Sequence, residues 1–359
     1  MDIQPPILHA GDPVHIIWNG EPYLFFGGYD YYRLSRHPLV LAAAADTLGR
    51  FGLNCGGSRV TTGNHPLHIE LEAALSEFLS TEDAALLPAG YMANLALFEL
   101  FNEDRPVCVF HPDAHPSLKK ALFTSGLPGT AIPSETTIFE EHLRAKGGNP
   151  LIITDGIYAD LPPLDLYFHL AEKYDGLLLI DEAHSLGILG EYGRGAAEYF
   201  NINGKRIILS GSLSKAIGTS GGFVAGPKEL IDRVRNTCAY ATTSALSLPI
   251  AAASTASLNW LRDHPEMIRG FQERCLKAKE RLIAAGYDMP AIPAPVISIH
   301  ISDRKRVNAL KNALMTDRIY PSLIRYPGKP DYFRFALSAV HSEADIDRLI
   351  RILTDEVSA

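Results

Sequence analysis

Cysteine is scarce in this chain, which has four among its 359 residues: Cys55, Cys108, Cys238 and Cys275. No two of them form a CxxC pair, and their spacing does not match a secreted disulfide framework. These absences argue against a zinc site and against a fold held together by disulfides. We therefore expect reduced thiols in a cytoplasmic protein that binds no metal.

Long apolar runs and blocks of basic residues are also missing. No segment has the length of a transmembrane helix, and the first twenty residues carry prolines and acids where a signal peptide has a basic end and an apolar core. The formal net charge is −8, from 33 basic and 41 acidic side chains. This balance argues against nucleic acid or an anionic membrane as the main partner, and we expect no membrane span.

Core-forming residues are plentiful, since 47% of the chain is hydrophobic and 21% is charged, as in soluble globular proteins. A single core rarely serves a chain of this length, so we expect a large domain with a smaller one packed on it. We place an N-terminal arm at 1–45, the large domain at 46–246 and the small C-terminal domain at 247–359.

Short apolar runs alternate with helix-like stretches between about residues 84 and 226. The runs are continuous, which is typical of strands covered on both faces; they read "AALL", "VCVF", "LIIT", "LLLI", "RIIL" and "GGFVAG". They predict an α/β domain with a mostly parallel central sheet. Toward the C-terminus, a strand-helix-strand-helix order predicts a smaller α/β layer, whose last helix opens with the capping-box pattern Ser342 to Asp345.

Polar residues directly follow three of the apolar runs. They are Asp155 after "LIIT", Asp181 after "LLLI" with His184 three residues on, and Ser210, Ser212 and Lys215 after "RIIL". Any one of the acids alone is explained by a turn or a helix cap. Ligands of open α/β sheets bind outside the carboxyl ends of the strands, so three such points at one sheet edge indicate a functional site.

Lys215 lies within "SGSLSKAIGTSGG", which contains literal matches to two serine-hydrolase motifs. Ser220 fits G-x-S-x-G, but a nucleophile elbow needs a strand before the serine and a helix after it, and here a strand-like segment follows. Ser212 fits S-x-x-K, but the companion K-T-G is absent. A Walker A loop is excluded because Ser214 precedes the lysine where that loop has glycine.

A lysine flanked by small residues is accessible to a flat aldehyde, which favours Schiff-base chemistry with pyridoxal phosphate (PLP). That cofactor acts as an electron sink while its ring nitrogen is protonated, and Asp181 at a strand end suits the required carboxylate. His184 follows closely enough to bond polar atoms of the cofactor. His115, after the strand "VCVF", offers an aromatic ring above it, although on spacing alone it is equally a surface or capping histidine.

The cofactor's phosphate requires backbone N–H groups at a helix start, together with hydroxyls. "PAGYMAN" supplies the first, because Gly90 follows a strand and opens a helix. Ser212 and the run Thr242 to Ser244 supply hydroxyls. The sequence therefore carries candidates for each part of a PLP site.

Taken in order, these segments resemble those of the α-oxoamine synthases. The resemblance runs from about Tyr29 to the C-terminus and rests on "LSRHP", "GLNCGGSRVTTGNHPLHIELE", "PAGYMAN", "HPDAHPSL", "ITDGIYAD", "IDEAHSLGILGEYGRG", "SGSLSKAIGTSGG", "YATTSALSLP" and "FRFALSAVHSEADIDRL". It implies a fold-type I PLP-dependent transferase, aspartate aminotransferase-like, that condenses an amino acid with an acyl-CoA.

The resemblance also implies roles for individual residues. Catalytic and cofactor roles fall on Lys215 as the Schiff-base lysine, Asp181 beneath the ring nitrogen, His184 near the phenolic oxygen, His115 stacked on the ring and Asp155 as the acid of the family's T-E-G motif. Phosphate contacts fall on Gly90, Tyr91, Met92 and Ser212, with Thr242 and Thr243 reaching over from a partner subunit. The resemblance therefore implies a homodimer with shared active sites. It also implies that Arg334 is the arginine that binds the amino-acid carboxylate.

Three departures from the family pattern fall on the substrate side. Tyr29 replaces a substrate-contacting asparagine, Arg33 replaces a glycine, and Ala159 stands where a serine commonly touches the cofactor. These changes leave open another PLP reaction on the same site, such as transamination, retro-aldol cleavage or racemisation. A non-catalytic subunit is disfavoured because Lys215 is present.

Overall fold

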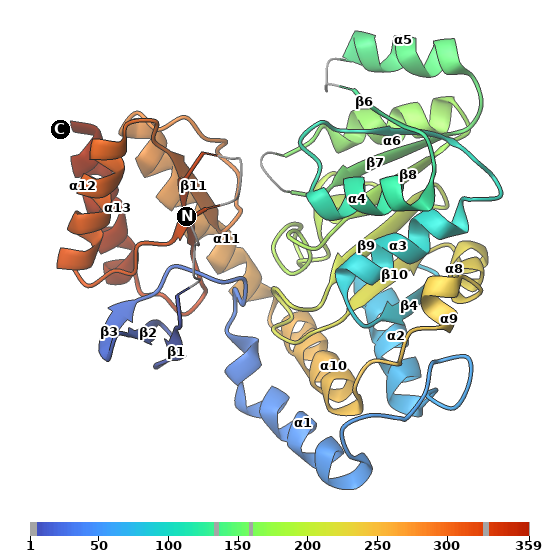
Figure 1. Cartoon of the computed structure of the whole chain (residues 1–359), viewed down its shortest axis with the longest axis horizontal. Helices are drawn as coiled ribbons and strands as arrows, with labels where there is room; N and C mark the ends of the chain where they lie inside the picture. The colour runs from blue at the N-terminus through green and yellow to red at the C-terminus, as the bar shows by residue number, and fades with distance from the viewer. Residues whose placement is uncertain (1–5, 133–135, 158–160, 326–329, 359) are drawn as a thin grey trace. The chain divides into compact units, whose positions relative to one another are not determined.

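The computed structural model describes residues 6–132, 136–157, 161–325 and 330–358, and Ala159 lies outside them. The chain forms two compact units, one of residues 34–269 and one of residues 1–33 with 270–359 (Figure 1). These limits differ from the expected boundaries after residues 45 and 246. The reason is local packing: α1 (Pro38–Phe51) lies against α10 (Leu248–Asp263) in the larger unit. The division into arm, large and small domains stays a prediction.

The larger unit is built on a seven-stranded mixed sheet. Its strands, in spatial order, are β4 (Asp83–Leu87), β10 (Gly222–Gly226), β9 (Ile207–Ser212), β8 (Leu177–Asp181), β7 (Pro150–Asp155), β5 (Val107–Phe110) and β6 (Gly129–Ala131). The strands from β9 to β6 run parallel, and β10 is antiparallel to both of its neighbours. The expected mostly parallel sheet is confirmed.

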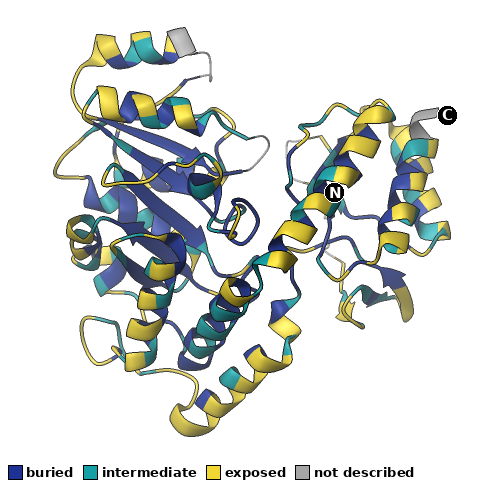
Figure 2. Ribbon diagram, turned by 180° about the vertical axis from the view of Figure 1, so that it is seen from behind, coloured by how far each residue is buried: buried dark blue, intermediate teal, exposed yellow. Residues whose placement is uncertain are grey.

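Helices cover the sheet, which explains why its strands are apolar without alternation. The remaining helices of this unit are α2 (Pro66–Leu79), α3 (Gly90–Leu100), α4 (Pro116–Ser125), α5 (Thr136–Lys146), α6 (Leu164–Lys173), α7 (Ala196–Tyr199), α8 (Lys228–Arg235) and α9 (Cys238–Ala241), besides the 3-10 turn Leu34–Arg36. Figure 2 shows the central strands as the most continuously buried part of this unit. All six residues of β7 are buried.

Three helices begin at a His-Pro pair, at residues 37–38, 65–66 and 115–116. In each, the histidine is the N-cap and its side chain accepts a hydrogen bond from the backbone N–H two residues on. The proline stands at the first helical position, where its missing N–H costs nothing. An uncharged imidazole therefore acts here as the oxygen of a serine or aspartate cap usually does.

The smaller unit holds two antiparallel three-stranded sheets. One contains β1 (His9–Ala10), β2 (His15–Trp18) and β3 (Glu21–Leu24), and the other has the order β11 (Val296–His300), β13 (Tyr332–Ala336) and β12 (Leu323–Ile324). The helices are α12 (Arg304–Thr316), α13 (Glu343–Ser358) and the part of α11 (Pro265–Ala284) from residue 270 onward. The expected smaller α/β layer is present, and its order, β11, α12, β12, β13 and α13, adds the short strand β12 to the expected strand-helix-strand-helix.

Two details explain how this smaller unit is assembled from the two ends of the chain. The backbone N–H of Ala336 donates to the carbonyl of Phe26 at 2.9 Å, and that of Tyr320 donates to Leu24 at 2.9 Å. The capping box is present, because the Asp345 N–H donates to Ser342 Oγ and the Ser342 N–H donates to Asp345 Oδ2. N-terminal residues therefore complete a C-terminal layer.

A buried glutamate organises the segment that follows β8. The Glu182 carboxyl accepts hydrogen bonds from the backbone N–H groups of Ala196 at 2.8 Å and Ala197 at 3.0 Å, and from the Ser185 hydroxyl. Gly195 lies so close that a Cβ there would stand 2.4 Å from a Glu182 oxygen. Burial raises the pKa of Glu182 to about 7, although the three hydrogen bonds oppose this shift.

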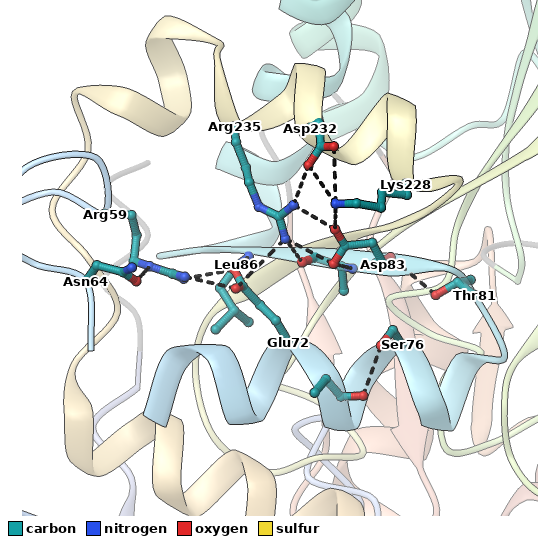
Figure 3. A network of polar contacts seen from close by, with 12 residues as sticks. Arg59, Asn64, Glu72, Ser76, Thr81, Asp83, Leu86, Lys228, Asp232 and Arg235 are labelled. Atoms are coloured by element: carbon teal, nitrogen blue, oxygen red, sulfur yellow. Dashed lines mark hydrogen bonds and ion pairs between the residues drawn. The ribbon is translucent and has the colours of Figure 1, made fainter. Parts of the chain in front are cut away.

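A polar network fixes the loop between α1 and α2 (Figure 3). The Arg59 guanidinium donates to both Glu72 oxygens, at 2.8 and 2.9 Å, and both side chains are only 7% exposed. One Glu72 oxygen also accepts from the backbone N–H of Leu86 in β4. Arg235 from α8 binds Asp83 beside it. Helix α2 and strand β4 are thus joined to the loop by charged groups that have been removed from water.

We expect Glu72→Ala to lower the free energy of unfolding by about 3–5 kcal/mol, because it leaves the buried Arg59 charge without its partner. The matched control is Asp46→Ala, which removes the partner of Arg50 in an exposed pair whose side chains are 65% and 64% exposed. That loss should be at most about 1 kcal/mol. Urea unfolding measures both, and equal losses in the two variants would contradict the prediction.

Glu182 leads to a pH-dependent prediction. Its pKa is about 7 in the folded protein against the ordinary value of 4.5, so the folded state keeps a proton that the unfolded state releases between these values. The stabilisation is complete below about pH 4.5 and is lost as the pH rises through about 7. Relative to Glu182→Gln, the wild type should lose about 3 kcal/mol of unfolding free energy across this window. A difference that stays constant with pH in urea unfolding would refute it.

Candidate active site

The ends of three neighbouring strands bring polar side chains together. Asp155 of β7 pairs in register with Asp181 of β8, and Asp181 pairs with Ser210 of β9. All three residues are buried. The structure therefore gathers at one sheet edge the residues that the sequence placed there.

The Asp181 carboxylate is held by two donors. Asn94 Nδ2 donates to one oxygen at 2.9 Å, and the backbone N–H of Ala183 donates to the other at 2.9 Å. Asn94 Oδ1 in turn accepts from the Ser210 hydroxyl at 2.7 Å. Hydrogen bonds to the ionised form favour it, so this arrangement stabilises a charged carboxylate in a buried position.

Sequence reasoning did not single out Asn94, although "PAGYMAN" ends on it. The available signal is that Asn94 is a polar residue on the buried face of α3, one helical turn beyond Gly90. A buried amide is expected to be fully hydrogen-bonded. An amide on the buried face of this helix therefore indicates a polar partner on the sheet.

Asp155 has a different environment from its neighbour. Its Oδ2 accepts from the backbone N–H of His115 at 2.7 Å. Burial raises the pKa of Asp155 well above its usual value, the adjacent Asp181 raises it further, and the His115 N–H and the Lys215 ammonium oppose the shift. Of the two neighbouring carboxyls, Asp155 is thus the one whose protonated form is favoured, by burial and by the adjacent Asp181.

His115 caps α4 and connects to the Asp181 cluster. Its Nδ1 accepts from the backbone N–H of Ser117 at 3.1 Å and lies 2.7 Å from the Ser117 hydroxyl. That hydroxyl also lies 3.4 Å from Asn94 Nδ2. With Nδ1 serving as an acceptor, the neutral ring carries its proton on Nε2. The same histidine therefore caps a helix and lies beside the strand ends, and its place above the cofactor ring stays a prediction.

The start of α3 has the properties of an anion site. Its N-cap, Ala89, makes no side-chain capping bond in the part of the chain that the structure describes, so the first N–H groups, which include those of Gly90, Tyr91 and Met92, have no intrahelical partner. A Cβ on Gly90 would lie 3.1 Å from that of Ser212, and one on Gly222 would lie 2.3 Å from the Ala89 carbonyl oxygen. This tightly built helix end, together with buried Asp181, fits the phosphate and ring nitrogen of PLP.

Lys215 lies in the connection between β9 and β10. The connection is closed by hydrogen bonds from the Leu213 N–H to the Gly221 carbonyl at 3.0 Å and from the Gly218 N–H to the Lys215 carbonyl at 2.9 Å. Lys215 is half-buried, and its charge lowers the pKa of Asp155, so the ammonium group is near the paired carboxyls. His184 is half-buried in the segment that follows Asp181.

The geometry disagrees with a serine-hydrolase site at this place. Ser220 is exposed in a turn between two antiparallel strands, without the helix that a nucleophile elbow requires. The Ser212 hydroxyl donates to the Gly221 carbonyl at 3.3 Å and lies 2.7 Å from the Ser214 hydroxyl. Ser212 also stands beside the start of α3, where a phosphate contact is geometrically reasonable.

Four of the predicted residues come from other segments of the chain. Thr242 and Thr243 directly follow α9 and donate to its carbonyls, at Cys238 and Ala239 respectively. Tyr29 and Arg334 belong to the smaller unit, where Arg334 on β13 donates through Nη1 to the Tyr29 hydroxyl at 2.5 Å.

Two expected absences concern metals and membranes. Across the described residues, His, Cys, Asp and Glu form no group of three or more that could hold a metal ion. In the same part of the chain, no helix combines the length and apolar character needed to span a bilayer. All four cysteines are free thiols in the structure.

Known proteins with similar sequences and structures agree with one another. The chain matches the family described as aminotransferase class I and II over residues 22–353. It is 32% identical over 351 residues to an 8-amino-7-oxononanoate synthase of Hahella chejuensis, covering 94% of this chain and 88% of that protein. It is 30% identical over 361 residues to a serine palmitoyltransferase of Sphingobacterium spiritivorum, covering 96% of this chain and 88% of that protein.

A solved structure extends the agreement to the fold. Serine palmitoyltransferase from S. paucimobilis, with a bound PLP–myriocin aldimine, has a TM-score of 0.89 at 25% identity, covering 97% of this chain and 90% of that chain. The expected fold-type I architecture is thereby confirmed. On sequence and on fold, the chain belongs to the aminotransferase class I and II family and, within it, to the α-oxoamine synthases.

Proposed function

We propose that this protein is a PLP-dependent acyltransferase that condenses a small amino acid with an acyl-CoA to give an α-oxoamine. The observation that carries the proposal is the placement of a buried, doubly hydrogen-bonded Asp181 beside the connection that holds Lys215. The relatives named 8-amino-7-oxononanoate synthase and serine palmitoyltransferase support the reaction class. Their different names leave the acyl chain and the amino acid open.

The strand-end carboxylate would hold the cofactor's ring nitrogen in its protonated form. PLP supplies an electron sink that stabilises negative charge on the α-carbon of a bound amino acid. Asp181 balances the ring's positive charge, and Asn94 keeps that carboxylate aligned through Nδ2. Because burial favours the protonated form of Asp155, Asp181 is the carboxylate proposed to pair with the ring. His115 lies at the same edge, placed by its N–H bond to Asp155, and is proposed to stack on the ring, with His184 near the phenolic oxygen.

Lys215 Nζ is the proposed covalent attachment point and the base that removes a proton from the α-carbon. Its loop is closed at both ends by backbone hydrogen bonds, which fixes where the amine can reach. The Lys215 charge in turn lowers the pKa of Asp155. A lysine that exchanges between covalent and free forms can hold or release a proton at one defined atom.

The phosphate site is proposed to be shared between two subunits. The free N–H groups of α3 and the Ser212 hydroxyl come from one chain, and Thr242 and Thr243 would come from the other. Ser58 bridges Ser244, so the loop that follows α1 lies beside this threonine segment. Exposed apolar side chains gather on α1, on this loop and on α2: Leu39, Leu41, Leu48, Phe51, Leu53, Val60 and Ile69.

Apolar side chains of this size, exposed together, are typical of an interface. A second copy of the chain would cover them while bringing Thr242 toward the partner's phosphate site, so we propose a homodimer. A cytoplasmic location is proposed with it, since the thiols are unpaired.

Another PLP reaction on the same site is the alternative, such as transamination. Tyr29 favours this alternative. Its hydroxyl accepts a hydrogen bond from Arg334, whereas the family pattern has at this position an asparagine that contacts the substrate. A keto acid formed without acyl-CoA would support this alternative, whereas thiol release that depends on both substrates would support the synthase.

We expect the purified wild type to absorb visible light after PLP is added, and to release free thiol when given an amino acid together with an acyl-CoA. Lys215→Ala should lose the lysine-linked absorption band and at least about 10³-fold in activity. Lys120→Ala, on the exposed face of α4, is the matched control and should keep both. Absence of the absorption band in the wild type would refute the proposal.

We expect Asn94→Ala to weaken PLP binding by about tenfold or more, because it leaves Asp181 Oδ2 and the Ser210 hydroxyl without their partner in a buried site. Asn236→Ala removes an exposed amide that bonds only its own helix at Asp232, and should leave PLP affinity unchanged. Titration of the apoprotein with PLP, followed by absorbance, measures both. Equal affinities for the two variants would contradict the role of Asn94.

A further inference from the structure

Tyr29 holds the Arg334 side chain through two kinds of contact at once. Arg334 Nη1 donates a hydrogen bond to the Tyr29 hydroxyl at 2.5 Å. The guanidinium carbon also lies 4.7 Å from the centre of the Tyr29 ring, within the range of a cation–π interaction. Both residues belong to the smaller unit. One phenol therefore restrains both the position and the orientation of this guanidinium group.

The contact engages one side of the guanidinium and leaves another available. Within the described residues, the hydrogen bond to Tyr29 is the only side-chain hydrogen bond that Arg334 makes. The Nε–H and Nη2–H groups lie on the opposite edge of the planar group from Nη1. Two parallel N–H donors on one edge are the geometry that a carboxylate accepts as a bidentate ligand. The structure thus holds Arg334 with a carboxylate-binding edge open.

The turn that carries Tyr29 is itself fixed. The Tyr31 N–H donates to the Tyr29 carbonyl at 2.9 Å, and buried Tyr31 accepts through its carbonyl from the Ala339 N–H at 2.7 Å. Arg33 closes the turn with an N–H bond to Asp30 at 3.1 Å. Its φ is +55°, a left-handed conformation that glycine adopts most readily.

A side-chain contact of Arg33 helps to hold this left-handed backbone conformation, which is less favourable for arginine than for glycine. Its Nε donates to the Pro13 carbonyl at 3.0 Å, which ties the turn to the N-terminal hairpin. The two departures from the family pattern in this segment, Tyr29 and Arg33, therefore belong to one built element. Tyr29 holds Arg334. Arg33 anchors the turn that carries Tyr29.

We propose that Tyr29 is a positioning residue for the amino-acid substrate: it orients Arg334 so that the Nε and Nη2 edge binds the substrate carboxylate, and it thereby sets the preference for carboxylate-bearing amines. This inference rests on the proposed function. It assigns to Tyr29 a different role from that of the family's asparagine, which contacts the substrate itself. Tyr29 acts through the arginine, by holding it.

The test compares amino acids with their methyl esters, which carry the same amine without the carboxylate charge. In the PLP-loaded enzyme, Tyr29→Phe should raise the apparent Kd for the amino acid about tenfold, measured by the change in visible absorption, with the Kd for the ester within about twofold. KM should rise in the same proportion while kcat stays within about twofold. Tyr29→Asn should behave like Tyr29→Phe toward Arg334.

A second measurement needs no cofactor. In the apoprotein, phenylglyoxal should modify Arg334 several times faster in Tyr29→Phe than in the wild type, as followed by peptide mass spectrometry, because the phenol no longer engages Nη1. Tyr23→Phe is the matched control: the Tyr23 ring faces Arg318 at 5.5 Å in the same unit. It should leave both the Arg334 rate and the amino-acid Kd unchanged.

The outcomes separate the two claims. If the wild type shows no absorbance change with any amino acid, the proposed function fails, and the carboxylate role of Arg334 fails with it. If the wild type responds and Tyr29→Phe discriminates amino acid from ester as well as the wild type does, the role of Tyr29 is overturned while the proposed function stands.

Discussion

Two carboxyl groups side by side at the end of a buried sheet are the constraint on which the candidate site depends. Asp155 and Asp181 end neighbouring parallel strands in register, and both are withdrawn from water. Holding two negative charges side by side in a buried position carries a large cost in free energy. Two hydrogen-bond donors stabilise the ionised form of Asp181. Burial and the adjacent Asp181 raise the pKa of Asp155. The two acids therefore differ: Asp181 is the proposed charged partner of the cofactor, and Asp155 accepts a hydrogen bond from the His115 N–H.

Helix α3 connects the separate parts of this arrangement. Its first N–H groups face the place proposed for phosphate, and Asn94, one turn further on, aligns Asp181. Near its other end, Glu99 accepts hydrogen bonds from the N–H groups of Cys238 and Ala239, at 2.6 and 2.9 Å, and so fixes the start of α9. The threonines at the end of α9 are therefore placed by the same helix that places the strand-end carboxylate. A shift of α3 along its axis would disturb both halves of the proposed phosphate site.

The sequence predicts the parts of this protein that are determined locally. Apolar runs indicate the buried parallel strands, and the polar residue after each run marks the edge where Asp155, Asp181 and Ser210 meet, because parallel strands end together. It did not indicate that N-terminal residues join the C-terminal layer, since the hydrogen bond from the Tyr320 N–H to the Leu24 carbonyl links segments that lie far apart in sequence. Asn94 was missed for a related reason: the role of a single amide in a helix depends on its partner, Asp181, on a distant strand.

The antiparallel strand β10 has a consequence for how the lysine reaches its place. Because β10 pairs with β9 by a direct turn, the segment that carries Lys215 is a local hairpin, whereas the carboxylates opposite it depend on crossovers between parallel strands. Local pairings close short loops and lose less chain entropy before they gain contacts. Lys215, the proposed attachment point, thus lies in a locally closed piece of the chain, whereas Asp155 and Asp181 come together only through the long-range pairing of parallel strands.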